Sequence, residues 1–245
     1  MKTIYSIFLL LIFISSAVFA QESSFYDAPF GGGGGYVGGW MIPKVDGINT
    51  QLKNFGDLHL PTSGFYTSGG AGFIYLGIVP GLRIGGMGFG GSRSSSSKIL
   101  VSVGTDNYFI GNEATYKMSG GALTLEYTIP FIKNFGVSAG VLIGRGSLEI
   151  DLYSNPGGID WSNLWSLPTG WSTSLVNRYW MFSPTINVDI PAYRLLDFRV
   201  GIGYQVTFGS HWTYDNNKDI YNAPSDINGN SFFFQAGIFV GLFSF

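Results

Sequence analysis

The chain has no cysteine and few charged residues, with Asp, Glu, Lys and Arg together making up 11% of its 245 residues. Without cysteine there is no disulfide framework, no thiolate metal site and no lipid-modified N-terminal cysteine. A charged fraction so far below the usual level of about 25% argues against a soluble globular domain. The net charge of -2 also gives no basic surface of the kind that nucleic-acid-binding proteins use, so no nucleic acid is expected as a partner.

Long hydrophobic runs are also scarce, and the one that stands out is at the N-terminus. Lys2 is followed by an almost unbroken apolar stretch from Ile4 to Ile14, and Val18 to Ala20 places small residues before Gln21. This pattern predicts a cleaved signal peptide over residues 1–20 and export of a mature chain, residues 21–245, as a single domain. Beyond Gln21 no stretch approaches the roughly 20 continuous apolar residues that a membrane-spanning helix needs.

A strict alternation of apolar and polar or small residues is the most informative pattern that is present. Apolar side chains occupy every second position of one segment: Leu196, Phe198, Val200, Ile202, Tyr204, Val206 and Phe208. A period of two indicates a β-strand with one apolar and one polar face. Because the run exceeds the roughly 9 to 11 residues of a tilted membrane-crossing strand, it predicts a strand of an outer-membrane β-barrel, with Val200 and Ile202 toward lipid and Gln205 toward a lumen that solvates it.

Short proline-containing links alternate with long polar stretches along the chain. Three similar links, at residues 78–82, 129–135 and 190–196, each end one alternating run and begin another, and we interpret them as short hairpin turns. Four longer polar stretches lie between them, at residues 43–64, 91–113, 153–173 and 210–229. Bacterial outer-membrane barrels have this asymmetry, with short turns in the periplasm and long loops outside, so the chain is expected to have four long outer loops.

The number of strands follows from these turns. Eight are predicted, at residues 33–42, 65–79, 82–90, 116–129, 135–152, 175–190, 195–213 and 231–245. A count of ten is the alternative, in which Ile99 to Val103 and Tyr108 to Met118 form an extra pair instead of prolonging a hairpin. The predicted fold class is therefore all-β, a transmembrane antiparallel up-and-down β-barrel of eight strands, or alternatively ten.

The C-terminus carries a family resemblance. The chain ends on Phe245, with Phe243 two residues earlier and Gly237 in the same alternating segment. This ending resembles that of the integral outer-membrane β-barrel proteins of Gram-negative bacteria, of the small eight-stranded type that includes the OmpA transmembrane domain, OmpX and OmpW. The resemblance implies location in the bacterial outer membrane, contact with its lipid and lipopolysaccharide, and a terminal strand that the barrel-assembly machinery recognises.

Four charged residues fall on the predicted inward face: Glu126, Asp189, Asp197 and Arg199. With a turn near Pro191, we expect Asp189 and Asp197 to lie opposite each other and Arg199 one diagonal away. Two adjacent carboxylates need a cation between them, which predicts a buried polar cluster near the periplasmic mouth. A network that fills the lumen and fixes strand register is favoured over a proton or ion path. Arg83 and Arg145 are possible further members, since the phase of their strands is uncertain.

The two histidines, His59 and His211, are both expected on the outer side. Ser210 and Asp215 flank His211, but adjacent strand residues point to opposite faces, so no catalytic group, metal site or cofactor is predicted. His211 and Trp212 are expected in the interfacial belt of the barrel instead.

A separate question concerns residues 45–60, where Ile48, Leu52 and Phe55 fall at helical spacing. A surface loop with one helical turn is favoured over a segment folded into the upper barrel.

The expected function is that of a non-enzymatic barrel with a structural or surface-interaction role through its outer loops. A narrow channel or conduit for a small apolar or ionic solute is the alternative, and a lipid-modifying barrel enzyme is the third possibility. The sequence does not identify a ligand or a surface partner.

Overall fold

The computed structural model describes residues 30–103, 106–132, 135–156, 170–193, 195–215 and 217–244. The expected signal peptide at residues 1–20 lies outside these residues. Among the described residues, no helix combines the length and apolar character that crossing a membrane requires.

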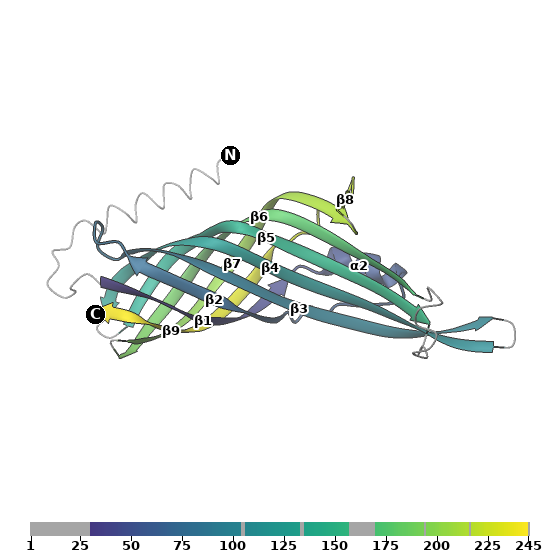
Figure 1. The fold of residues 1–245 in the computed structure, drawn as a ribbon, viewed down its shortest axis with the longest axis horizontal. Helices are drawn as coiled ribbons and strands as arrows, with labels where there is room; N and C mark the ends of the chain where they lie inside the picture. Colours follow the sequence, from purple (N-terminus) through teal and green to yellow (C-terminus); the bar gives the residue numbers. More distant parts are fainter. Residues whose placement is uncertain are drawn as a thin grey trace.

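The chain forms one closed ring of antiparallel strands (Figure 1). The wall strands are β1 (Phe30–Pro43), β2 (Phe65–Tyr75), β3 (Leu82–Val103), β4 (Asp106–Ile132), β5 (Phe135–Pro156), β6 (Trp171–Tyr193), β7 (Leu196–Tyr214) and β9 (Ser231–Ser244). Each pairs with its neighbour along the chain, and β1 pairs with β9 to close the ring. The two-residue β8 (Lys218–Asp219) is added to the edge of β7, outside the ring. The predicted eight-stranded up-and-down barrel is confirmed.

The alternative count of ten strands is wrong because the outer hairpin continues β3 and β4 without a break. The pairing of these two strands runs in one register from Leu82 opposite Tyr127 to Val103 opposite Asp106. The hairpin extends well beyond the ends of the other strands (Figure 1). Much of the stretch at residues 91–113, expected as a long loop, is therefore paired strand.

The barrel has two unlike ends. The β2–β3, β4–β5 and β6–β7 connections are short and lie at one end, which we call the turn end. At the β2–β3 connection Gly81 adopts a φ of 77°, a left-handed conformation that glycine reaches without a Cβ clash. The opposite end, which carries the β3–β4 hairpin and α2 (Asp46–Asn54), is called the loop end.

The strand faces follow the sequence alternation. Val200 and Ile202 are 48% and 42% exposed on the outside, whereas Gln205 is 1% exposed inside. Gln205 points inward, as expected. The expected lumen that solvates it is not observed. Its amide donates a 2.8 Å hydrogen bond to the Gly229 carbonyl, in a packed interior.

The helix α2 lies inside the loop end, so the favoured surface loop is wrong. Ile48 and Leu52 are buried, and they join an apolar core with residues of the strand walls. Asn49 fixes the following chain by donating to and accepting from the backbone of Leu60, at 3.0 and 2.8 Å. The apolar spacing identified the helix, but its partners lie on strands that sequence periodicity cannot bring together.

A bulge in β7 changes the face on which the last residues of this strand lie. Gly209 has a φ of 67°, and the β6–β7 register shifts between Arg178 and Trp180. Trp212 consequently points inward and is buried in the apolar core, while His211 points outward. The expected position of Trp212 in the interfacial belt is therefore wrong.

Candidate functional site

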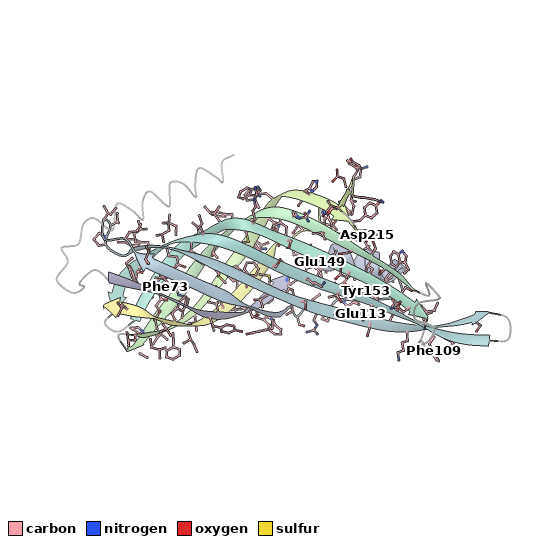
Figure 2. The ribbon with its side chains drawn as sticks, viewed as in Figure 1. Phe73, Phe109, Glu113, Glu149, Tyr153 and Asp215 are labelled. Atoms are coloured by element: carbon pink, nitrogen blue, oxygen red, sulfur yellow. The ribbon has the colours of Figure 1, made fainter. Side chains whose placement is uncertain are left out.

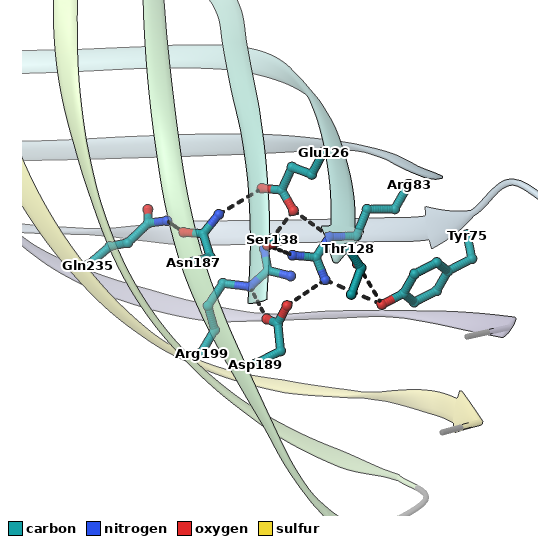
Figure 3. A network of polar contacts seen from close by, with 9 residues as sticks. All are labelled: Tyr75, Arg83, Glu126, Thr128, Ser138, Asn187, Asp189, Arg199 and Gln235. Carbon is teal, nitrogen blue, oxygen red and sulfur yellow. Dashed lines mark hydrogen bonds and ion pairs between the residues drawn. The ribbon is translucent and has the colours of Figure 1, made fainter. Parts of the chain in front are cut away.

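Five charged side chains lie buried inside the turn end of the barrel, and we call them the interior charge cluster; Figure 3 shows all of them except Asp197. They are Arg83 on β3, Glu126 on β4, Asp189 on β6, and Asp197 and Arg199 on β7. None is more than 6% exposed. Each occupies an inward position of an alternating strand, which places charges from four strands in one small volume.

Two arginines and two carboxylates of this cluster alternate around a ring of ion pairs. Arg83 Nε lies 2.5 Å from Glu126 Oε2, and Arg83 Nη1 lies 2.7 Å from Asp189 Oδ2. Arg199 Nε lies 2.6 Å from Asp189 Oδ1, and its Nη1 lies 3.4 Å from Glu126 Oε2. Each carboxylate therefore contacts both guanidinium groups, which compensates buried charge that would otherwise be very costly.

Neutral polar side chains extend this ring to further strands. Arg83 Nη2 donates to Ser138 Oγ on β5 at 2.5 Å. Asn187 Nδ2 on β6 donates to Glu126 Oε1 at 3.3 Å, and Gln235 Nε2 on β9 donates to Asn187 Oδ1 at 2.6 Å. With the 3.5 Å contact from Arg83 Nη1 to Tyr75 OH on β2, the network joins every wall strand except β1.

Aromatic rings cover the arginines from the side. The Arg83 and Arg199 guanidinium carbons lie 4.7 and 4.6 Å from the centre of the Phe73 ring, and Arg199 lies 4.7 Å from the Phe239 ring. Cation–π contacts of this kind stabilise a desolvated guanidinium while leaving its N–H groups free for carboxylates. Phe73 and Phe239 themselves pack at 5.5 Å.

The arrangement differs from the sequence prediction in its pairing. Asp189 lies opposite Arg199, and Asp197 lies opposite Pro191, because pairing continues to Tyr193 and Leu196 and the turn is therefore closer to β7 than expected. The register shift between Pro191 and Tyr193 then places Arg199 opposite Asp189. The expected pairing of Asp189 with Asp197 is therefore wrong. The sequence left open whether Arg83 and Arg145 face the interior. Arg83 points inward, whereas Arg145 lies on the outer wall.

Sequence reasoning missed the neutral partners of the cluster. Strand alternation marks Ser138, Asn187 and Gln235 as inward-facing, and this was the only signal that could have identified them. Nothing in their sequence context distinguishes them from other inward polar residues. Of the residues predicted to form the assembly signal, Gly237 faces inward and the Phe243 backbone pairs with Gly31. Phe245 lies outside the described residues.

Beyond the charge cluster, apolar side chains of the described residues pack into a core. Met118, Leu148, Met181 and Phe233 from the wall, together with Leu52 of α2, belong to one buried apolar core toward the loop end. Between this core and the charge cluster lies a cavity of about 20 Å³ near Met41, Gln205 and other inward residues. This volume accommodates roughly one water molecule.

Among the described residues of the loop end, His211, Ser210 and Asp215 do not form a hydrolytic arrangement. His211 Nε2 lies 3.2 Å from Asp219 Oδ1, Ser210 Oγ accepts a 3.3 Å hydrogen bond from Asn177, and Asp215 accepts from Thr173. The three residues that could be imagined as a triad therefore have separate partners. In the part of the chain that the structure describes, no group of three potential metal ligands occurs, and His59 lies exposed elsewhere.

An apolar belt covers the outside of the barrel between the turn end and the base of the outer hairpin. All eight wall strands contribute exposed apolar side chains to it: Tyr36, Trp40, Tyr66, Ile74, Ile84, Leu123, Leu125, Ile143, Phe182, Ile186, Ile190, Phe198, Val200, Ile202, Val206, Phe208, Phe232, Phe234, Ile238, Val240 and Leu242. The ten residue steps from Phe198 to Phe208 cover about 33 Å along β7, or about 25 Å of height at a strand tilt of about 40°. This height matches the apolar band of outer-membrane barrels.

Charged and polar residues replace this belt toward the loop end, where Glu149, Glu113 and Asp215 lie (Figure 2). Lys117 contacts Glu149 at 3.0 Å and Asp151 at 2.5 Å across β4 and β5. The hydrogen bonds that the Lys117 ammonium donates to Asp151 and Glu149 raise its pKa. Burial raises the pKa of the Asp151 carboxyl, but the bonds from Lys117 and Ser174 outweigh it and hold that pKa below its usual range. The wall above the belt is thus a charged, water-facing surface.

Comparisons with known proteins give structural similarities only. No protein-family model and no curated protein matches the chain. Solved structures that are similar include a major outer membrane protein from Thermus thermophilus, with 8% identity and a TM-score of 0.47 over 88% of this chain and 100% of that chain. The attachment invasion locus protein Ail of Yersinia pestis, in complex with the heparin analogue sucrose octasulfate, has 10% identity and a TM-score of 0.40, over 89% and 100% of the two chains.

The outer membrane protein OprG from Pseudomonas aeruginosa is a third, with 12% identity and a TM-score of 0.37, over 88% of this chain and 94% of that chain. The architecture of the present chain rests on its own strand pairing.

Proposed function

We propose that the mature chain is a non-enzymatic integral outer-membrane β-barrel, closed to solutes, that acts through the polar structure at its loop end. The observation that supports this most is the combination of an apolar outer belt with a filled interior. A soluble barrel would not present so many apolar side chains around its whole circumference. An open pore would not fill its lumen with ion pairs and an apolar core.

The orientation follows from the unlike ends. Because short turns of such barrels lie in the periplasm and their long loops outside, the unlike ends support an orientation with the loop end and its β3–β4 hairpin at the cell surface. The exported chain would reach this location through its predicted signal peptide at residues 1–20.

A surface role is supported by the shape and composition of the loop end. The β3–β4 hairpin projects beyond the rest of the wall (Figure 1). Exposed aromatic side chains lie around the same end, among them Phe109, Tyr153, Trp171 and Tyr221. Aromatic residues on a polar, rigid support are typical of surfaces that contact other macromolecules.

Cell fractionation combined with surface detection tests this proposal. An epitope inserted between Val103 and Asp106, in the β3–β4 connection, should be detected by antibody on intact cells, and the protein should remain with outer membranes after a urea wash. The folded form should also migrate differently from the boiled form on a denaturing gel. Recovery in the soluble periplasmic fraction, or an epitope accessible only after the outer membrane is opened, would contradict the proposal.

A further inference from the structure

A hollow of about 550 Å³ lies on the outer wall just above the apolar belt. Its polar rim is made by Arg145, Arg178, His211, Ser119 and Ser147. Gly120, Gly146 and Gly209 also line it, and the small size of these glycines and serines leaves the space between the longer side chains open. The hollow lies outside the interior charge cluster and has no part in the proposed closure of the barrel.

The strand register arranges this rim in two rows. In the upper row, Ser119 pairs with Ser147, Ser147 with Arg178, and Arg178 with His211, so four strands contribute one side chain each. In the lower row Arg145 pairs with Trp180. Arg145 and Arg178 are consequently diagonal neighbours, about 7 to 8 Å apart at the backbone, which lets two long side chains reach one anion.

Both guanidinium groups retain donors for such an anion. Arg145 stacks on the Trp180 ring at 4.1 Å, a contact that uses the face of the guanidinium and leaves its N–H edge available. Arg178 donates through Nη2 to Asn217 Oδ1 at 3.1 Å, which positions the group but does not neutralise it. Two acids on the outer wall near this rim are already paired. Asp219 contacts His211, and Glu149, a diagonal neighbour of Arg178 in the strand register, contacts Lys117.

The surface directly below the hollow is apolar. The next row toward the turn end consists of Leu123, Ile143, Phe182 and Val206, which are paired across the same four strands. Two cations above an apolar wall suit an amphiphile whose anionic head sits in the hollow and whose chains lie along the wall. A free anion would gain nothing from the apolar row.

We propose that this hollow binds the phosphate monoester headgroup of a membrane lipid, with Arg145 and Arg178 as the main donors and Ser119 and Ser147 as supporting hydroxyl groups. Guanidinium groups match phosphate oxygens in bidentate geometry, and charge-assisted bonds of this kind are stronger than neutral ones. The inference rests on the proposed insertion of the belt into a membrane, since only then does a lipid reach this wall.

Native mass spectrometry of the full mature protein in neutral detergent tests the site. Phosphatidic acid, a phosphate monoester lipid, should bind more tightly than phosphatidylcholine, whose phosphate is a diester with a choline cation. Arg145→Gln and Arg178→Gln should each weaken phosphatidic acid binding about tenfold, as expected for a lost charge-assisted bond. Lys98→Gln removes an exposed cation outside the hollow and should leave binding unchanged. The gel mobility of each variant before boiling verifies that it is folded.

Equal affinity for the two lipids, or variants that bind like the wild type, would overturn the proposal. Inorganic phosphate is tested as a competitor of phosphatidic acid in a third measurement. If it competes as strongly as phosphatidic acid, the apolar row contributes nothing and a lipid site is excluded. Because these measurements use detergent, they give an answer independent of cell fractionation, so a failure of the site is distinguishable from a failure of the outer-membrane proposal.

Discussion

At the scale of single residues, the interior charge cluster shows how a closed barrel accommodates charge. Arg83 and Arg199 each contact both Glu126 and Asp189, so none of these four residues depends on one partner alone. Removing one cation leaves a single guanidinium group to compensate two buried carboxylates, in a space that water barely reaches. Arg199→Ala should therefore lower the free energy of unfolding by about 3 to 5 kcal/mol. Urea titration of the protein refolded in lipid vesicles measures this change.

The control for this prediction is Arg93→Ala, which removes an exposed arginine and should change stability by less than about 0.5 kcal/mol. A paired change, Arg83→Met with Glu126→Gln, removes one charge of each sign and should cost less than Arg83→Met alone. Equal losses for Arg199→Ala and Arg93→Ala would show that the cluster does not stabilise the fold.

A second prediction at this scale concerns glycines on opposite faces of β2. A Cβ at Gly69 would collide with the Gly88 carbonyl on the neighbouring strand, whereas a Cβ at Gly70 would lie 3.5 Å from the nearest atom, the Gly35 carbonyl oxygen. Gly69→Ala should therefore impair refolding, and Gly70→Ala should be tolerated. The fraction of each variant with folded gel mobility after refolding gives the comparison, and equal yields would show that inward crowding at β2 is unimportant.

At the scale of elements, α2 acts as part of the core instead of as a surface loop. Ile48 and Leu52 pack against the wall inside the loop end. Leu52→Ala should cost about 2 to 5 kcal/mol of unfolding free energy, because it leaves a cavity in a core that relaxes only partly. Lys53→Ala changes an exposed position on the same helix and should have little effect. If both variants unfold at the same urea concentration, α2 is not an integral part of the core.

A further prediction concerns the lipid face of β7. Ile202→Arg places a cation in the middle of the apolar belt and should cost about 2 to 4 kcal/mol in a bilayer, whereas Thr115→Arg, above the belt on β4, should cost less than about 1 kcal/mol. Refolding into lipid vesicles followed by urea titration separates the two. Comparable losses of unfolding free energy for the two variants would show that the position assigned to the apolar belt is wrong.

These elements also show what the sequence could and could not predict. The period-two pattern of β7 predicted the directions of Val200, Ile202 and Gln205, since alternation depends only on the local backbone. Trp212 was misplaced because the bulge at Gly209 reverses the phase, and a single glycine among 37 gives no signal that it is a bulge. The opposition of Asp189 to Arg199 likewise depends on a register shift in the β6–β7 turn region that residue spacing does not reveal.

At the scale of the whole molecule, the two halves of the interior have different chemistry. The turn end is filled by an ion-pair network that joins seven wall strands, and the loop end by an apolar core that includes α2. An ion entering from the turn end would have to break buried pairs and then cross the apolar core. Both halves therefore oppose conduction, which is why we favour a closed barrel over a channel.

Ion conductance across a planar lipid bilayer is the most direct test of this central claim. Purified, refolded protein is added to the bilayer, and its insertion is verified by antibody detection of the epitope in the β3–β4 connection. We predict no steady conductance steps above the background of the bare membrane, at any applied voltage that the bilayer tolerates. Reproducible single-channel steps from verified, folded protein would contradict the closed barrel and favour the channel.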